Sequence, residues 1–438
     1  MTETKQTRPN VIFILADDLG WGDVGYHGAS IRTPNIDRLA RHGVELDRHY
    51  VCPVCTPTRV SLLSGMHPGR FGAHATVPTN DPIFPDNHYT LANLFRNAGY
   101  DTGLFGKWHL GSDPRHGPNH FGFDYSYGSF AGGVDPYSHR YKPGPFVKTW
   151  HRNGTPVEEP GHVTDLIVNE AIDWMERRKQ PFFCYLPFTA VHTPVRPPEE
   201  WFDRYADANI FDDPEQNEAF QRYAAYTSHM DHAVGKVVEM LKRQDILGET
   251  MVVFASDNGS VTYDKPCDYL SFPGCRDDMQ PAGCNEPLRG NKATLYEGGV
   301  RPPAIISWRD SLRSGKLDTP MHISDWMPTF AHMLNVRVPG DPEFDGVNMW
   351  PLISGGETTP PERGIYWNLK HTRFAIREDG WKLIVRREED EEPLELFHID
   401  EDPYEKENVA AQHPDIVSRL KKRIDAEHAK DDRLKRDH

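Results

Sequence analysis

The sequence predicts an α/β fold in which helices sandwich a large, mainly parallel sheet, followed by a small C-terminal antiparallel sheet with one helix. Three observations lead to this prediction. Short runs of consecutive apolar residues recur along the chain, as expected for strands buried on both faces of a parallel sheet. Segments with apolar residues at helical spacing separate these runs. After about residue 340 the pattern changes to short strands joined by a tight turn.

The elements of the first half follow from local patterns. Residues 11–16 read Val-Ile-Phe-Ile-Leu-Ala between polar neighbours, which predicts a buried strand. Thr33 as N-cap, Pro34 in the first turn and Gly43 at the end mark the first helix. The next elements in order are a helix over about 90–99, a strand over 100–106, a helix over 163–178 and a strand over 182–188.

The second half adds a long helix with Tyr223 to Leu241 on one face and a buried strand at 251–255. A Pro/Gly-rich stretch at 339–346 then marks the expected boundary, which gives a main domain at 1–340 and a C-terminal α+β subdomain at 341–438. The subdomain is predicted from strands at 373–377, 381–385 and 394–399 and an amphipathic helix at 414–430.

Composition excludes several classes of protein. The chain has 438 residues and a formal net charge of −16, which argues against a nucleic-acid binder because phosphate binding needs clustered Lys and Arg. No apolar run approaches the roughly 18–20 residues of a membrane span. The first nine residues are polar, so the sequence as written predicts a cytoplasmic protein, or a periplasmic or secreted one if an export signal has been removed.

Polar side chains follow four of the predicted strands. They are Asp17 and Asp18, Lys107 and His109, His192, and Asp257 and Asn258. Ligands of open parallel α/β sheets bind outside the carboxyl ends of the strands, so these groups are expected to meet at one edge.

The acidic members of this set favour a metal site. Three carboxylates and one amide oxygen, Asp17, Asp18, Asp257 and Asn258, would repel one another unless a cation neutralised them. All-oxygen ligation suits Ca²⁺ or Mg²⁺ rather than Zn²⁺. The alternative is that these residues only cap helices and form turns, which is the more frequent role of each pair taken alone.

The basic members favour an anionic ligand. Lys107 and His109 lie two residues apart, so an extended backbone would turn both to one side. With His192 and Lys292 they would gather positive charge and proton donors on a molecule that otherwise repels anions. A lone Lys or His in a loop is more often solvated surface.

Cys55 precedes Thr56-Pro57, a second helix-start pattern, with Arg59 one turn later. The helix N-terminus and Arg59 would favour an anion there and lower the pKa of the thiol. Three interpretations compete: a buried cysteine without a role, a redox Cys-x-x-Cys pair with Cys52, and a catalytic residue.

The segment Cys-Thr-Pro-Thr-Arg at 55–59, followed by Leu-Ser-Gly at 63–65, resembles the C-x-P-S/T-R signature of type I sulfatases. Further blocks resemble that family in the same order: residues 9–23, Gly-Lys-Trp-His-Leu-Gly at 106–111, His-Thr-Pro at 192–194, Ser-Asp-Asn-Gly at 256–259 and Pro-Leu-Arg-Gly-Asn-Lys at 287–292. The resemblance covers roughly residues 8–335. It is nearest to the arylsulfatase B-like N-acetylgalactosamine-4-sulfatases, and it implies an alkaline-phosphatase-like fold with residues 1–340 as the catalytic domain.

The resemblance also implies a role for each residue. A separate maturation enzyme would oxidise Cys55 to Cα-formylglycine, which would complete a Ca²⁺ site with Asp17, Asp18, Asp257 and Asn258. Arg59 and Lys107 would hold the formylglycine hydroxyls, and His109 would be the base. His192 and Lys292 would bind sulfate and protonate the leaving group.

The function implied is hydrolysis of sulfate esters of sulfated carbohydrates, by exo attack on a terminal sugar. Two alternatives remain: a phosphonate monoester hydrolase or phosphodiesterase of the same superfamily, and a non-catalytic protein that binds sulfated glycans. Val261 to Cys284 resembles an insertion, in which Cys267, Cys275 and Cys284 either form one disulfide or are incidental. Arg70, His74, His139 and Arg196 lie in loops that could contribute to a substrate pocket.

Overall fold

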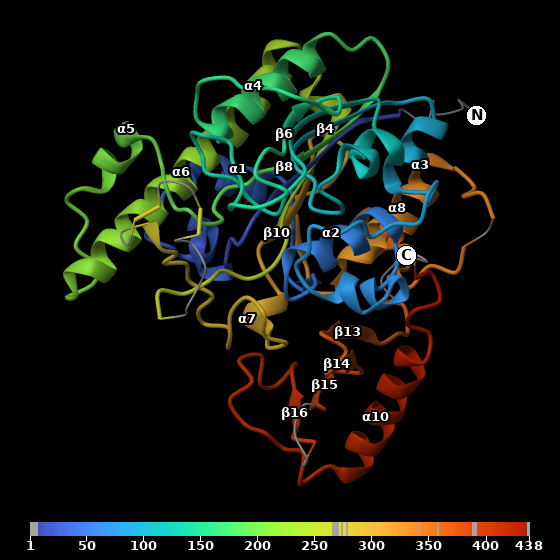
Figure 1. Cartoon of the computed structure of the whole chain (residues 1–438). Helices are drawn as coiled ribbons and strands as arrows, with labels where there is room; N and C mark the ends of the chain where they lie inside the picture. Colours follow the sequence, from blue (N-terminus) through green and yellow to red (C-terminus); the bar gives the residue numbers. More distant parts are fainter. Residues whose placement is uncertain are drawn as a thin grey trace.

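A computed structural model describes residues 8–264, 271–272, 275–276, 279–340, 342–356, 359–387 and 392–435. Its main feature is a ten-stranded sheet in the order β11-β2-β10-β9-β1-β8-β4-β5-β6-β7 (Figure 1). The middle of this sheet, from β9 to β5, is parallel. β10 runs antiparallel to β9 and to β2, and β6 and β7 close the other edge in antiparallel fashion.

The strand bounds of this sheet are β1 (Asn10–Ala16), β2 (Val44–Leu46), β4 (Asp101–Lys107), β5 (Tyr125–Ser129), β6 (Trp150–Arg152), β7 (Thr155–Pro156), β8 (Phe182–Pro187), β9 (Thr250–Ser256), β10 (Ala304–Trp308) and β11 (Gly315–Leu317). A separate two-stranded sheet pairs β3 (His49–Tyr50) with β12 (Met321–His322).

Both faces of the large sheet are covered, because alternate side chains of its central strand enter two different cores. Val11, Phe13 and Leu15 pack in one core, and Ile12 and Ile14 pack in the other. The first core receives α2 (Cys55–Ser64), α3 (Leu91–Asn97), α8 (Trp326–Leu334) and α9 (Trp350–Ile353). The second receives α1 (Pro34–His42), α4 (Val163–Glu176), α5 (Glu199–Phe202) and the long α6 (Pro214–Arg243).

The C-terminal part forms a four-stranded antiparallel sheet below the large one (Figure 1). One face packs Trp367 and Ile384 against Tyr50 of the main part, and the other receives Leu420 and Ile424 of the last helix. Its elements are β13 (Ile365–Leu369), β14 (Arg373–Glu378), β15 (Trp381–Arg386), β16 (Leu394–His398) and α10 (Pro414–His428), and the short α7 (Glu297–Val300) lies beside it.

A buried ion cluster joins the two parts. The Arg70 guanidinium is fully buried and contacts the carboxylates of Asp345, Glu427 and Asp431 at 2.8, 2.6 and 2.7 Å. Glu427 belongs to α10 and Asp431 follows it, so this one arginine ties the loop after α2 to the C-terminal end of the chain.

The predicted α/β fold with its small antiparallel sheet is confirmed. The division at residue 340 stays a prediction, since α9 still packs in the core of the large sheet. None of the helices described is both long and apolar enough to cross a membrane.

Candidate active site

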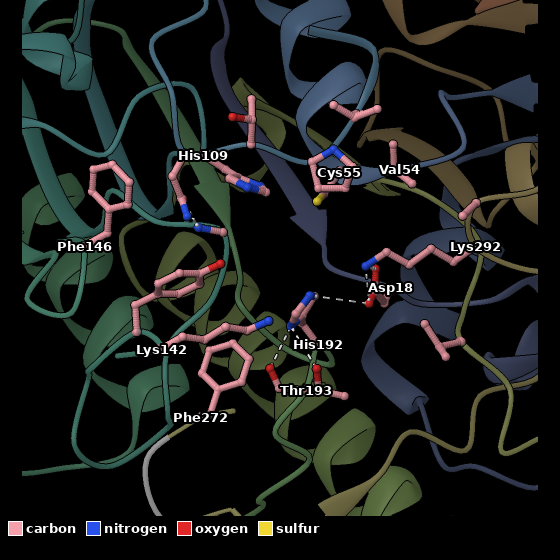
Figure 2. Close-up of a pocket in the computed structure, with 18 of the residues that line it drawn as sticks. Asp18, Val54, Cys55, His109, Lys142, Phe146, His192, Thr193, Phe272 and Lys292 are labelled. Atoms are coloured by element: carbon pink, nitrogen blue, oxygen red, sulfur yellow. Dashed lines mark hydrogen bonds and ion pairs between the residues drawn. The ribbon is translucent and has the colours of Figure 1, made fainter. Parts of the chain in front are cut away.

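The carboxyl ends of β1, β4, β8 and β9 meet the start of α2 at one edge of the large sheet. A cavity of about 700 Å³ opens there. Cys55, the first residue of α2, lines it together with Asp18, His109, His192 and Lys292 (Figure 2). The sequence-predicted groups therefore converge.

Asp17 and Lys107 form a buried ion pair below this cavity. The Lys107 Nζ atom lies 2.7 Å from Asp17 Oδ2, and both side chains are fully buried. The pKa of Asp17 is raised to about 8, chiefly by burial and further by the charges of Asp257 and Asp18, against the attraction of Lys107. Its second oxygen, Oδ1, has no hydrogen-bond partner among the described residues.

Asp18 carries the opposite shift. Burial would raise its pKa, but Lys292, His192 and Lys107 hold the pKa of this carboxyl well below its usual range. Lys292 Nζ lies 2.7 Å from Asp18 Oδ1, and His192 Nε2 lies 3.9 Å from Asp18 Oδ2. Asp18 is therefore the carboxylate that stays charged, paired with the Lys292 ammonium and beside the His192 ring.

Asp257 and Asn258, which follow β9, complete the acidic group. Asp257 Oδ2 accepts a 2.7 Å hydrogen bond from Arg59 Nη2, and Asp257 Oδ1 accepts one from the Asp18 amide. Asn258 donates to Asp18 Oδ1 at 2.7 Å, while its own buried Oδ1 has no hydrogen-bond partner in the part of the chain that the structure describes. Arg59 also donates to the Lys107 carbonyl, which fixes the guanidinium between the ends of β4 and β9.

These oxygens fit a hard divalent cation. No described residue donates a hydrogen bond to the buried oxygens Asp17 Oδ1 and Asn258 Oδ1, which is a costly arrangement unless a positive group contacts them. Ligand atoms of Asp17, Asp18 and His192 lie within 4.8 Å of one another. Carboxylate and amide oxygens are the ligands that Ca²⁺ and Mg²⁺ prefer.

The Cys55 side chain is buried, with only 2% of its surface exposed. The prediction that the helix start and Arg59 lower the pKa of its thiol is wrong. Burial raises the pKa above its ordinary value, although Lys107 and Lys292 pull it down. The loss of hydration outweighs the nearby positive charge. Cys52 is a buried free thiol whose Sγ lies 3.6 Å from Ser61 Oγ, so the described structure contains no Cys52–Cys55 disulfide.

His109 follows β4 with a left-handed backbone at φ 58°. Burial and then Lys107 and Arg59 hold its pKa well below the usual value, so the ring is neutral near pH 7. Its Nδ1 has no hydrogen-bond partner among the described residues. The ring can therefore accept a proton.

His192 and Lys292 face Asp18 from two sides of the cavity (Figure 2). Burial, followed by Lys292, lowers the pKa of His192 to about 3. His192 Nδ1 lies 2.7 Å from the Thr193 carbonyl and must donate there, which leaves Nε2 without a proton in the neutral ring. Lys292 keeps its proton, since Asp18 raises its pKa despite burial.

Two contributors to the site were missed from the sequence. Thr58 Oγ1 donates to the Asp257 carbonyl at 2.6 Å and so ties α2 to the end of β9. Gly132 lies so close to His109 that an added Cβ would be 2.3 Å from the ring Nε2. The sequence marks this position only by the adjacent glycines Gly132 and Gly133.

Four loop residues suggested by the sequence do not line the cavity. Arg70 belongs to the buried ion cluster, Arg196 pairs with Asp135 at 2.9 Å, and His139 Nε2 bonds the Gly161 carbonyl. His74 lies in a short helical turn away from it. Among the three clustered cysteines, Cys275 and Cys284 are not bonded to each other, and Cys267 lies outside the described residues.

The fold and this site define a class of protein: an α/β enzyme in which a group of carboxylates suited to a divalent cation lies beside Cys55, the first residue of α2. A sequence profile described as Sulfatase matches residues 9–336, and one described as N-sulphoglucosamine sulphohydrolase, C-terminal, matches residues 290–430. The chain belongs to the sulfatase family and is a sulfuric ester hydrolase of the alkaline-phosphatase-like superfamily. The family expected from the motifs is thereby confirmed.

Individual relatives agree. Arylsulfatase J of Mus musculus is 30% identical over 95% of this chain and 75% of its own length. N-acetylgalactosamine-6-sulfatase of Canis lupus familiaris is 31% identical over 84% of this chain and 70% of its own. Among solved structures, Ps i-CgsB in complex with k-i-k-neocarrahexaose is 30% identical, with a TM-score of 0.84 over 98% of this chain and 94% of that one.

Proposed function

We propose that this enzyme removes sulfate from sulfated carbohydrates by exo attack on a terminal sugar, using a formylglycine made from Cys55 and one Ca²⁺. The observation that carries the proposal is the position of Cys55. It begins α2 at the one edge where the acidic group and the cationic side chains meet. The names of the relatives support the substrate class, since they act on galactosamine sulfates or bind a carrageenan oligosaccharide.

The metal would be held by Asp17, Asp18, Asp257 and Asn258, with residue 55 completing the site. Ca²⁺ would neutralise these side chains and stabilise negative charge on the sulfate oxygens. Lys107 would stay paired with Asp17 and present its charge beneath residue 55. Arg59 is fixed by Asp257 and the Lys107 carbonyl, so it would orient the hydroxyls of residue 55 without moving.

Residue 55 requires conversion by a formylglycine-generating maturation enzyme, because burial keeps the native thiol protonated. The hydrated aldehyde supplies two hydroxyls on one carbon, one to attack sulfur and one through which the sulfate can later be expelled. His109 has a neutral ring and an unpartnered Nδ1, which suits removal of the proton from the second hydroxyl.

Lys292 and His192 would hold the sulfate and protonate the departing sugar oxygen. Lys292 carries its proton at neutral pH, whereas His192 Nε2 is unprotonated in the described state. An anionic sulfate beside His192 would attract a proton to Nε2 and raise its pKa. Lys292 is therefore the donor that needs no prior change of protonation.

The test combines a chemical and a kinetic measurement. Peptide mass spectrometry of protein co-expressed with the maturation enzyme should find the aldehyde at residue 55, and the enzyme should release inorganic sulfate from sulfated saccharides. Cys55→Ser and Cys55→Ala should keep the fold and lose turnover. Wild-type-like activity in either variant contradicts the mechanism, and faster turnover of an aryl phosphate diester than of an aryl sulfate would favour the phosphonate-hydrolase alternative.

A further inference from the structure

One wall of the active-site cavity is a loop to which the proposed mechanism gives no role. Residues 77–81 all line the cavity, and they follow a short helical turn, Ala73–Thr76. Asn80 in this loop is half-buried, and its side chain joins the loop to the segments that follow β4 and β5. An uncharged amide in such a position can hold the wall together and also contact a ligand.

The carboxamide oxygen of Asn80 is held from two sides. The Ser112 hydroxyl donates to Asn80 Oδ1 at 2.8 Å, and the Gly132 backbone amide donates to the same oxygen at 3.2 Å. The Asn80 backbone carbonyl also accepts from the Ser112 amide at 2.9 Å. A backbone N–H can only donate, so the end of the carboxamide that faces Gly132 must be its oxygen. The NH₂ group therefore points the other way.

This NH₂ group is available to a ligand. Asn80 Nδ2 donates to none of the described residues, and the atom is accessible rather than buried. Because Asn80 lines the cavity and its oxygen is turned toward Ser112 and Gly132, Nδ2 is the end of the side chain that a ligand in the cavity meets. It offers two N–H donors and carries no charge.

The backbone that holds Asn80 also positions His109. The His109 amide donates to the Phe130 carbonyl at 3.0 Å, and Ser112 Oγ lies 3.3 Å from the same carbonyl. Gly132, which donates to Asn80, is the glycine whose Cα lies against the His109 ring. Asn80 is therefore fixed relative to the proposed base by a short series of hydrogen bonds.

We propose that Asn80 Nδ2 donates a hydrogen bond to a hydroxyl group of the sugar that carries the sulfate. His109 and Lys292 lie on opposite sides of the cavity (Figure 2), so this donor is on the side away from the oxygen that Lys292 would protonate. Asn80 is thus a specificity residue that does not touch the reacting atoms. The inference rests on the proposed function and deepens it, since the enzyme would select sugars by one uncharged hydroxyl as well as by the sulfate.

The test measures sulfate release from singly sulfated methyl glycosides of galactose, N-acetylgalactosamine and glucosamine. Each glycoside is compared with derivatives in which one free hydroxyl is replaced by hydrogen. For one hydroxyl of the preferred glycoside, we expect kcat/KM of the deoxy derivative to be about threefold to tenfold lower than that of the parent, the effect of one neutral hydrogen bond. This ratio should not change with salt, because the donor is uncharged.

Asn80→Ala should bring the ratio of parent to deoxy derivative close to one. Asn119→Ala is the matched control and should keep the ratio. Asn119 is also half-buried, and its Oδ1 also accepts from a serine hydroxyl, that of Ser126, but it does not line the cavity. The inference is overturned if the ratio persists in Asn80→Ala, or if it stays below about twofold for every hydroxyl in the unaltered chain. Either result leaves the proposed function standing, whereas no sulfate release from any glycoside overturns both.

Asn80→Asp keeps the oxygen that Ser112 and Gly132 bind and removes only the donor, so it tests the inference without disturbing the wall. Fluorine in place of the same hydroxyl can accept a hydrogen bond but cannot donate one. The ratio of fluoro to deoxy kcat/KM should therefore fall about threefold or more from the unaltered chain to Asn80→Asp. The effect of fluorine on the ester itself is the same for both proteins and cancels in this comparison. An unchanged ratio would show that Asn80 does not contact the hydroxyl.

Discussion

At the scale of single residues, the site gives two neighbouring carboxyl groups opposite pKa shifts. Asp17 and Asp18 are adjacent in sequence and both buried, yet burial raises the pKa of Asp17 to about 8 while Lys292, His192 and Lys107 overcome burial at Asp18 and lower it. In the same group, one side-chain oxygen of Asp17 and that of Asn258 receive no hydrogen bond from any residue within the described ranges. A bound cation removes both the repulsion and the orphaned acceptors.

Calcium should therefore stabilise the fold measurably. In thermal unfolding, Ca²⁺ at a hundredfold excess over its Kd is expected to add about 2.7 kcal/mol, and EDTA should reverse the gain. Asp17→Asn should lose most of the Ca²⁺-dependent rise in Tm. Asp81→Asn, on the rim of the same cavity, serves as control and should keep the full rise. An unchanged Tm on adding Ca²⁺ to the unaltered chain would exclude the cation site.

Acid stability depends on a histidine outside the site. His49 is fully buried in β3, its Nε2 accepts a 3.1 Å hydrogen bond from the Trp326 indole, and burial lowers its pKa from 6.5 to about 3. Between these two values the unfolded chain binds a proton that the folded chain does not. Stability should therefore fall as the pH drops from about 6.5 to about 3, at about 1.4 kcal/mol per pH unit for this group.

Denaturant unfolding of His49→Gln over this pH range tests the effect, because the glutamine carbonyl can still accept from Trp326. Its free energy of unfolding should vary less steeply with pH, by about one proton. His42→Gln, exposed at the end of α1, should match the unaltered chain. Parallel profiles for His49→Gln and the unaltered chain would show that His49 contributes nothing.

At the scale of elements, the sequence predicted the long helices and the central strands β1, β4, β8 and β9, but not β5, β10, β13 or the short strands at the edges of the large sheet. Seven-residue apolar strands such as β1 and β9 are buried on both faces, so their sequence shows it directly. β7 and β11 have two and three residues and no buried side chain, so neither periodicity nor composition marks them. Most site residues were found because they follow strands with a clear buried pattern, whereas Cys55, Arg59 and Lys292 were found from a helix-start pattern and the family motifs. Thr58 was missed as a contributor because its partner is a distant carbonyl.

The position of α2 relative to the end of β9 should depend on the Thr58 hydroxyl. Thr58 Oγ1 donates to the Asp257 carbonyl and accepts from the Cys52 amide. Thr58→Val keeps the shape but leaves these buried groups unpaired, which should cost about 1–3 kcal/mol and lower kcat by shifting residue 55 relative to Asp257. Thr58→Ser should restore both, as measured by urea unfolding and sulfate release. Full activity in the valine variant would show that the bond does not position α2.

At the scale of the whole molecule, the C-terminal sheet is joined to the main part by charge as well as by packing. Arg70 meets three carboxylates in a fully buried position, and Lys382 lies 2.9 Å from both Glu297 and Glu405, with all three side chains buried. Removing one member of such a cluster should destabilise the fold strongly, because the free-energy cost of an unpaired buried charge exceeds the net stabilisation that the ion pair provides.

Arg70→Met should destabilise the fold by about 3–5 kcal/mol, since Asp345, Glu427 and Asp431 would lose their shared cation. Arg433→Met removes a pair with the exposed Glu343 and should change stability by less than about 1 kcal/mol. Urea unfolding of both variants gives the comparison. A small effect at Arg70 would mean that apolar packing alone attaches the C-terminal sheet.

The turn after β13 places Leu369 and Lys370 of the C-terminal sheet in the wall of the cavity. A short surface turn tolerates replacement far better than the buried strands that carry the chemistry. Exchanging this hairpin tip between relatives is therefore expected to change which sulfated carbohydrates the enzyme accepts while leaving the buried groups at the strand ends in place.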